Sequence, residues 1–596
     1  MVQSLPPESL QGIFKFFKDD KKTLHSCLLV NKFWSQCAVP FLWNRPFELS
    51  SKPTGKIIET YSKFFDKESQ KILSSYGIFI NPIIKPNLFD YPIFIKSLQY
   101  NYIYDFSSVW LQEGHDKGQQ KCYSGFEKTN LLRIFVKELF KLFFSKKSII
   151  EDLSFNVIRF LDAPDIAGSR LVSRFRPYRD ASYIKRALEY LSLFEEDIIE
   201  ILSYENSKIS LNHLQKLECG ANRNDVIIMN IFRNLTKSIN TLKFNFASEL
   251  RNNNGLDDQN IMNTMKNLII EQKYLKSVSI RHGSQHVPEL INSLEFHVMN
   301  LTELSFDKID FNVIPSAEKI FFTISLCKNL EKLVVSNCQG ITNEIILPLG
   351  NTTFTNLETL IFTKVHNPID DIFRAFLTGI PRNNHHIQLT LEPLTNLIMG
   401  TNGNLKILRL GRNLLYSRDL PNDFVFTTTY PPIDVMNAVS LNCNNLTIFE
   451  IHIRREILPH VIKLLESTNQ LIRFIFSAEM DLVDDEGFWK NLSNILPIGL
   501  KDLTISIGPV FWLVVLYWLF DNMKCKLEIL QFPLSIFIDD EYLCIITQYA
   551  KLMGGTLKRL ALHNSNKVTE KGLSKALLVI ENITNTGEYN HHQIGI

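Results

Sequence analysis

A short pattern of apolar positions recurs along most of the chain. It has the form apolar-x-x-apolar-x-apolar, and most of its units begin about 25 to 30 residues apart. A single match has little weight in a chain that is 45% hydrophobic, so the regular spacing is what indicates a repeat. The units begin at Leu214, Ile239, Leu275, Leu301, Leu330, Leu357, Leu405, Leu446, Leu471, Leu500, Leu527 and Leu557.

Each unit predicts one short strand. Successive side chains of a strand point to opposite faces, so the apolar residues of the pattern would point into a core and their neighbours outward. One unit cannot bury its own apolar face, but stacked units would share a continuous core. Helical segments such as residues 260–273 would cover the convex side. The pattern therefore predicts an α/β solenoid, a curved parallel sheet with helices on its convex side.

Two units carry a fuller motif. Residues 330–342 read L-x-x-L-x-V-x-x-C-x-x-I-T, and residues 557–569 read L-x-x-L-x-L-x-x-S-x-x-V-T. Both resemble cysteine-containing leucine-rich repeats, in which Cys338 would be structural. The same pattern also begins at Ile95 and at Ile150, so we expect the leucine-rich-repeat solenoid to begin early in the chain.

The residues between the core positions of the strands form a candidate binding surface. They would line the concave face of the sheet, where a protein target could bind. Most of them individually would be merely solvated strand residues, because a minority of the contacts in an interface carry its energy. As a set, the candidates are Ser277, Ser279, Arg281, Arg409, Glu450, His452, Arg473, Arg559 and His563.

The first residues follow a helical pattern. Pro6, Pro7 and Glu8 are typical of a helix start, because proline fixes φ and a carboxylate suits the positive end of the helix dipole. The apolar residues at positions 10, 13, 14 and 17 would share one stripe of that helix. A second helix is expected from a cap at Thr23, and a shift of phase near Asn31 opens a third. So small a unit should leave part of its apolar surface to a partner or to the following domain.

These residues resemble an F-box. The resemblance covers residues 4–47 and depends on the ordered motifs L-P-P-E from Leu5, I-F-x-F-F from Ile13, C-L-L-V-N-K-F-W from Cys27 and P-F-L-W from Pro40. F-boxes dock on the Skp-type adaptor of a cullin ubiquitin ligase through the Leu-Pro start and apolar helix faces. The resemblance therefore implies adaptor contacts by Leu5, Pro6, Pro7, Ile13, Phe14, Leu28, Val30 and Trp34. The alternative is that these helices are only the N-terminal cap of the solenoid.

Composition narrows the range of partners. Lys and Arg total 64 against 62 Asp and Glu, so no bulk positive field would hold nucleic acid. Without a secretory signal, the nine cysteines are expected to be thiols in the cytoplasm or the nucleus, and they form no Cys-x-x-Cys pair that would indicate a metal site. The most apolar run, residues 510–520, has about half the length of a membrane span, so it predicts a buried helix and no membrane association.

Motifs for catalysis or for a cofactor are missing from the sequence. It contains no phosphate loop, dinucleotide fingerprint, H-E-x-x-H or G-x-S-x-G pattern. The acidic runs at residues 484–486 and 539–541 are interpreted as solvated turns rather than as metal ligands or acid-base groups, and the histidine pairs at 385–386 and 591–592 likewise. The sequence thus predicts a protein that is not an enzyme and needs no cofactor.

The expected organisation has three parts. They are an F-box-like helical module at residues 1–47, a connector with irregular early repeats at 48–213 and a leucine-rich-repeat solenoid at 214–590. The F-box resemblance implies that the chain recruits a target protein to a cullin-type ubiquitin ligase. The alternatives are a leucine-rich-repeat scaffold or sensor, and an undetected hydrolase or transferase.

Overall fold

The chain folds into two compact units, residues 1–296 and 297–596. A computed structural model describes residues 5–48, 53–80, 88–116, 125–155, 193–194, 196–220, 225–246, 255–282, 286–363, 392–410, 433–478, 482, 484–506, 513–532, 538–562 and 568–585.

Three short helices form the N-terminal module, residues 5–48. They are α1 (Pro7–Phe16), α2 (Lys21–Leu28) and α3 (Lys32–Leu42). The predicted cap of α2 was wrong, because Asp20 is the N-cap and its carboxylate accepts a hydrogen bond from the Thr23 amide at 3.0 Å. Asn31 caps α3 in the same way. The core of the module consists of Leu10, Phe14, Leu24, Cys27, Cys37 and Ala38.

The rest of the first unit alternates strands with helices. The strands β1 to β5 are Ser97–Gln99, Asp152–Ser154, Lys216–Gly220, Thr241–Asn245 and Ser277–Arg281, and each is parallel to the next. A 3-10 helix, η1 (Tyr91–Phe94), precedes β1. The helices are α4 (Gly55–Ser62), α5 (Lys67–Ser75), α6 (Tyr100–Asp116), α7 (Gly125–Ser145), α9 (Ser207–Leu211), α10 (Asp225–Leu235), α11 (Gly255–Ile270) and α12 (Val287–Ser293).

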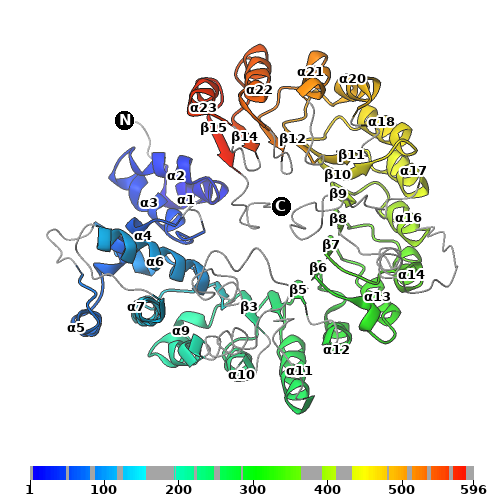
Figure 1. Ribbon diagram of the computed structural model, residues 1–596. Helices are drawn as coiled ribbons and strands as arrows, with labels where there is room; N and C mark the ends of the chain where they lie inside the picture. Colours follow the sequence, from blue (N-terminus) through cyan, green and yellow to red (C-terminus); the bar gives the residue numbers. More distant parts are fainter. Residues whose placement is uncertain are drawn as a thin grey trace. The chain divides into compact units, whose positions relative to one another are not determined.

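The second unit continues the alternation. Its strands β6 to β15 are Glu303–Asp307, Lys332–Ser336, Thr359–Thr363, Ile407–Leu410, Ile448–Ile453, Arg473–Ala478, Asp502–Ile505, Ile529–Phe532, Arg559–Leu562 and Asn582–Asn585, again parallel in chain order. The helices are α13 (Glu318–Ser325), α14 (Asn343–Gly350), α16 (Glu392–Met399), α17 (Ile433–Asn442), α18 (Leu458–Ser467), α20 (Glu486–Ile495), α21 (Leu513–Asp521), α22 (Asp540–Leu552) and α23 (Glu570–Leu577). Within this unit the strands line the inner side and the helices lie outside (Figure 1).

The predicted α/β solenoid is confirmed. All twelve units of the apolar pattern coincide with strands β3 to β14, and their second and third apolar residues are buried. The two earlier matches form β1 and β2, so strands begin well before residue 214. The last strand, β15, was not predicted, because Asn585 stands where the pattern has its third apolar residue.

In several repeats of the second unit, the asparagine immediately before the first leucine forms a hydrogen bond to the preceding repeat. The Asn329 side chain donates a hydrogen bond to the Met299 carbonyl at 2.8 Å, and the Asn404 side chain donates to the Thr355 carbonyl at 2.8 Å. Asn445 makes the same kind of contact at 3.0 Å. Each bond reaches back one repeat, which satisfies a loop carbonyl and adds about 0.5 to 1.5 kcal/mol of stability.

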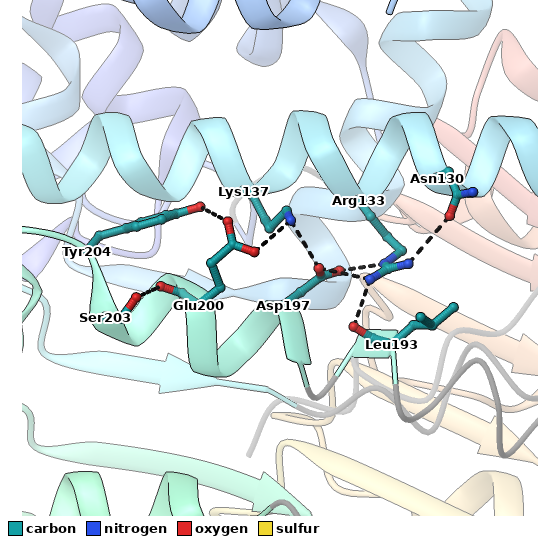
Figure 2. Close-up of polar contacts among 8 residues, drawn as sticks. All are labelled: Asn130, Arg133, Lys137, Leu193, Asp197, Glu200, Ser203 and Tyr204. Carbon is teal, nitrogen blue, oxygen red and sulfur yellow. Dashed lines mark hydrogen bonds and ion pairs between the residues drawn. The ribbon is translucent and has the colours of Figure 1, made fainter.

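A cluster of buried ions joins α7 to the helical residues 196–203 (Figure 2). Arg133 donates two hydrogen bonds to the Asp197 carboxylate, from Nε to Oδ2 at 2.5 Å and from Nη2 to Oδ1 at 2.9 Å. Lys137 lies 3.4 Å from Asp197 and 2.8 Å from Glu200. Because the Asp197 side chain is 2% exposed, its charge depends on these partners for stabilisation.

Candidate functional site

The N-terminal module keeps a set of large apolar side chains in solvent. Ile13 (42% exposed) and Phe16 (89%) lie on α1, Leu5 (48%) precedes it, and Leu29 (76%) and Val30 (56%) follow α2. We call these five residues the docking face. Exposed apolar surface of this kind on a small module typically marks an interaction site.

The residues implied by the F-box resemblance fall into three groups. Five are exposed, namely Leu5, Pro6, Pro7, Ile13 and Val30. Leu28 and Trp34 are half-buried and pack against the core of the module. Phe14 corrects the prediction, because it is 1% exposed and its ring meets Trp34 edge-on at a centroid distance of 5.6 Å. Phe14 therefore belongs to the core and is not presented to a partner.

Two residues of the docking face were missed from the sequence. Phe16 and Leu29 were not assigned to any surface, although they are its most exposed members. Phe16 lies outside the predicted apolar stripe of its helix, which should have indicated that it has no place in the core.

The end of the module continues into the first repeat. The Asn44 carbonyl accepts hydrogen bonds from the amides of Lys96 at 2.8 Å and Ser97 at 3.2 Å. In the next repeat, the Lys96 carbonyl accepts the corresponding pair from Glu151 and Asp152. Residue 44 therefore takes the place of a preceding repeat at the exposed edge of the sheet.

Aromatic and acidic side chains strengthen this junction. The ring centroid of Tyr61 lies 5.5 Å from that of Trp43 and 5.9 Å from that of Phe47. Glu48 accepts hydrogen bonds from the side chains of Ser97 and Gln99. These contacts involve residues 43–48 and none of the docking face.

The concave face of the second unit carries two rows of side chains across the parallel register. The first row is Ile407, Ile448, Arg473, Asp502, Ile529, Arg559 and Asn582, and the second row is Arg409, Glu450, Ile475, Thr504, Gln531, Ala561 and Thr584. Arg409 and Glu450 are direct neighbours and form an ion pair, with side chains 12% and 6% exposed. Glu450 is thus held inside a pair and is not open to a partner, contrary to its prediction as a contact residue.

The first row also contains an ion pair, between Arg473 and Asp502. Arg473 Nε lies 3.1 Å from Asp502 Oδ2, and Gln531 Nε2 donates to Asp502 Oδ1 at 3.2 Å. Burial raises the pKa of the Asp502 carboxyl above its ordinary value, although the nearby guanidinium groups of Arg473 and Arg559 favour the charged form. The cluster holds two cations around one partly desolvated carboxylate.

The other candidates for target binding are scattered. His452 Nδ1 lies 2.7 Å from Ser477 Oγ on the next strand. Ser277, Ser279 and Arg281 occupy alternate, half-buried positions of β5 in the first unit. His563 lies outside the described residues.

The acidic runs and cysteines have structural surroundings. The runs form helix starts rather than turns, because Asp485 and Asp539 are the N-caps of α20 and α22 and Glu486, Asp540 and Glu541 lie in the first turns of these helices. Cys338 donates weakly to the Ser336 carbonyl at 3.3 Å, and burial raises its pKa to about 12, which makes it an unreactive thiol. Burial raises the pKa of Cys327 and Cys443 to about 12 as well. Both histidine pairs lie outside the described residues.

The described residues offer neither a metal site nor a membrane span. Within the described part of the chain, no three His, Cys, Asp or Glu residues are grouped so that they could hold a metal ion. None of the described helices combines the length and the apolar character that crossing a bilayer requires.

Comparison with known proteins identifies the N-terminal module. Residues 2–48 match the F-box-like family. No curated protein matches the chain. A chain in the structure of the Rad7 and Elc1 complex in yeast is 12% identical, with 66% of this chain and 92% of that chain covered and a TM-score of 0.38. The leucine-rich repeat-containing protein LegL7 from Legionella pneumophila is 13% identical, with 51% and 90% covered and a TM-score of 0.29.

Proposed function

We propose that this chain, with its F-box-like N-terminal module, is the target-recruiting subunit of a cullin-type ubiquitin ligase in the cytoplasm or the nucleus. Its docking face would bind the Skp-type adaptor, together with Pro6, Pro7 and the half-buried Leu28 and Trp34. The concave face of its repeats would bind a target protein. The observation that carries this proposal is the exposed apolar docking face on a module of the F-box-like family.

The contacts of the module argue against a role as a cap alone. A cap needs contacts that cover the end of the solenoid core, and the rings of Trp43 and Phe47 and the backbone carbonyl of Asn44 supply them. The docking face takes no part in them. Leaving Phe16 at 89% exposed has no benefit for a cap, whereas a docking surface requires such residues.

In this proposal the chain makes and breaks no covalent bond itself. It would hold a target near the ligase-bound conjugating enzyme, which raises the effective concentration of the target's lysines there. The junction at Asn44 supports such a role, because backbone hydrogen bonds and the packing of Phe47 on Phe106 join the module to the first repeats. A firm junction would restrict the positions that a bound target can reach.

The test is co-purification of the full chain with a Skp-type adaptor. A variant with Leu5→Ala and Ile13→Asp should lose the adaptor and keep its fold, because both side chains are exposed and interface anchors commonly contribute about 2 kcal/mol or more. Trp34→Ala is a poorer test, because Trp34 packs on the module core and its loss would also destabilise α1.

The matched control is Leu552→Asp, which replaces an 83% exposed leucine of α22 by the same charge. It should leave adaptor binding unchanged. If the double variant keeps its circular dichroism spectrum and still binds the adaptor like the wild type, the docking face is not the adaptor site. If the wild type itself fails to bind, the cap interpretation gains.

A further inference from the structure

The charges on the concave face are not balanced in the second unit. The two rows defined above carry three arginines against two carboxylates across β9 to β15. In the first unit, the corresponding positions of β1 to β5 carry two lysines, Lys216 and Lys243, against Asp152 and Glu218. In β9 to β15 the two rows therefore carry one more positive than negative charge, whereas in β1 to β5 they are balanced.

Pairing within the rows identifies the cation in excess. Arg409 is neutralised by Glu450, and Asp502 is shared between the nearby Arg473 and the amide of Gln531. Arg559 makes neither a hydrogen bond nor an ion pair through its side chain with any described residue, and its Nε is buried. The buried Nε of Arg473 likewise donates no hydrogen bond within the described chain, although it lies 3.1 Å from Asp502 Oδ2.

Buried nitrogen donors are rarely left without an acceptor in a folded protein. Asp502 already pairs with Arg473 and accepts from Gln531, and Ile529 lies between Asp502 and Arg559 in the register. Guanidinium groups prefer a carboxylate or a phosphate, whose oxygens match their planar fork of donors. The site is thus suited to one additional anion.

The neighbours of Arg559 indicate what accompanies that anion. Ile529 lies between Asp502 and Arg559 in the first row and is half-buried, and Ile448 lies on the other side of Arg473. Adjacent strands are about 4.8 Å apart, so Arg473 and Arg559 are separated by roughly 14 Å, a span that an extended segment of about four residues covers. Between the two arginines, such a segment would meet Asp502 and then Ile529.

We infer that Arg559 binds an acidic group of the target protein, a carboxylate or a phosphate, next to an aliphatic side chain that packs on Ile529, with Arg473 three strands away in the same row. The inference rests on the proposed function in one respect, namely that the ligand is a captured target protein. Its anion chemistry depends on the side chains of β11 to β14 alone.

The test uses a synthetic array of nonapeptides with degenerate flanks and a central glutamate, phosphoserine, glutamine or serine, probed with the full-length protein. The wild type should retain the glutamate or the phosphoserine pool about tenfold better than its uncharged counterpart, and less so at high salt. Arg559→Gln should abolish this preference. Lys558→Gln is the matched control. Lys558 is the residue before Arg559, its exposed side chain pairs with Glu528, and the substitution removes one positive charge as Arg559→Gln does.

The outcomes separate the possibilities. Preference for both acidic pools assigns a general anion site, and preference for phosphoserine alone assigns a phosphate site. Equal retention of acidic and uncharged pools by the wild type, or an unchanged preference in Arg559→Gln, overturns the inference. If Arg559→Gln melts early, Arg559→Lys keeps the charge and should retain a weakened preference. Adaptor binding, measured on the same preparations, tests the ligase proposal independently.

Discussion

The buried ion cluster between α7 and residues 196–203 gives a prediction with a definite size (Figure 2). Asp197→Ala removes the carboxylate that neutralises Arg133 and Lys137, whose side chains are only 13% and 20% exposed. Removing one partner of a buried ion pair commonly lowers the free energy of unfolding by about 3 to 5 kcal/mol, because the remaining charge stays desolvated. We expect a loss of stability in that range.

The loss should be local, so native-state hydrogen exchange is the suitable measurement. Amides of α7 and of residues 196–203 should exchange faster by about two to three and a half orders of magnitude, since each 1.36 kcal/mol is a factor of ten. Amides of the second unit should keep their protection, because they belong to a separate compact unit.

Two variants control this prediction. Glu200→Ala removes a 51% exposed partner of Lys137 and should change protection by less than about 1 kcal/mol. Replacing the pair together, as Arg133→Met with Asp197→Leu, should recover most of the loss, because no unpaired charge remains. If Asp197→Ala changed exchange by less than tenfold, the cluster would not hold these helices together.

Two further predictions concern stability. Leu408→Ala, at the fully buried second position of β9, should cost about 2 to 5 kcal/mol in urea unfolding, because it leaves a cavity in the core. Lys406→Ala, at a 53% exposed position just before the strand, should cost less than about 1 kcal/mol, and equal losses would contradict the burial of Leu408 in the core. Burial and the nearby charge of Glu48 raise the pKa of the Asp152 carboxyl from 3.8 to about 6. The folded state therefore binds the carboxyl proton more tightly than the unfolded state, and the free energy of unfolding should fall as pH rises from about 4 to 6. Asp152→Asn should flatten this part of the pH profile of thermal melting and raise the midpoint at pH 7, and an unchanged profile would remove Asp152 as its cause.

The repeats were predictable because their signal is local. Three apolar residues with fixed spacing determine which side of a strand is buried, and this held for every predicted unit. Helices were located less exactly, as with the expected helix at 260–273, which is α11 at Gly255–Ile270, and the apolar run at 510–520, which lies partly in α21 at Leu513–Asp521. Their bounds depend on caps and on packing between repeats.

The candidate target site was less predictable because its properties come from pairs that are distant in sequence. Alternation alone placed Arg409 and Glu450 on the concave face, but only the register between β9 and β10 makes them neighbours. Arg409→Ala would therefore leave the buried carboxylate of Glu450 without its ion-pair partner and destabilise the sheet. It is not the mild surface change that the sequence suggests. Arg559 is the opposite case, since the register places it between Ile529 and Asn582, one strand further from Asp502 than Arg473 is.

The sequence allowed two interpretations of the N-terminal module, a docking domain or a cap, and the structure divides its residues between three tasks. Leu10 and Phe14 build the core, Asn44 and Phe47 continue the repeats, and the docking face does neither. The two interpretations are therefore compatible, because the cap is made by the last few residues of the module and the exposed apolar side chains belong to its first two helices and their ends. Substitutions of the docking face should leave the other two tasks intact, which allows adaptor binding to be tested without unfolding the repeats.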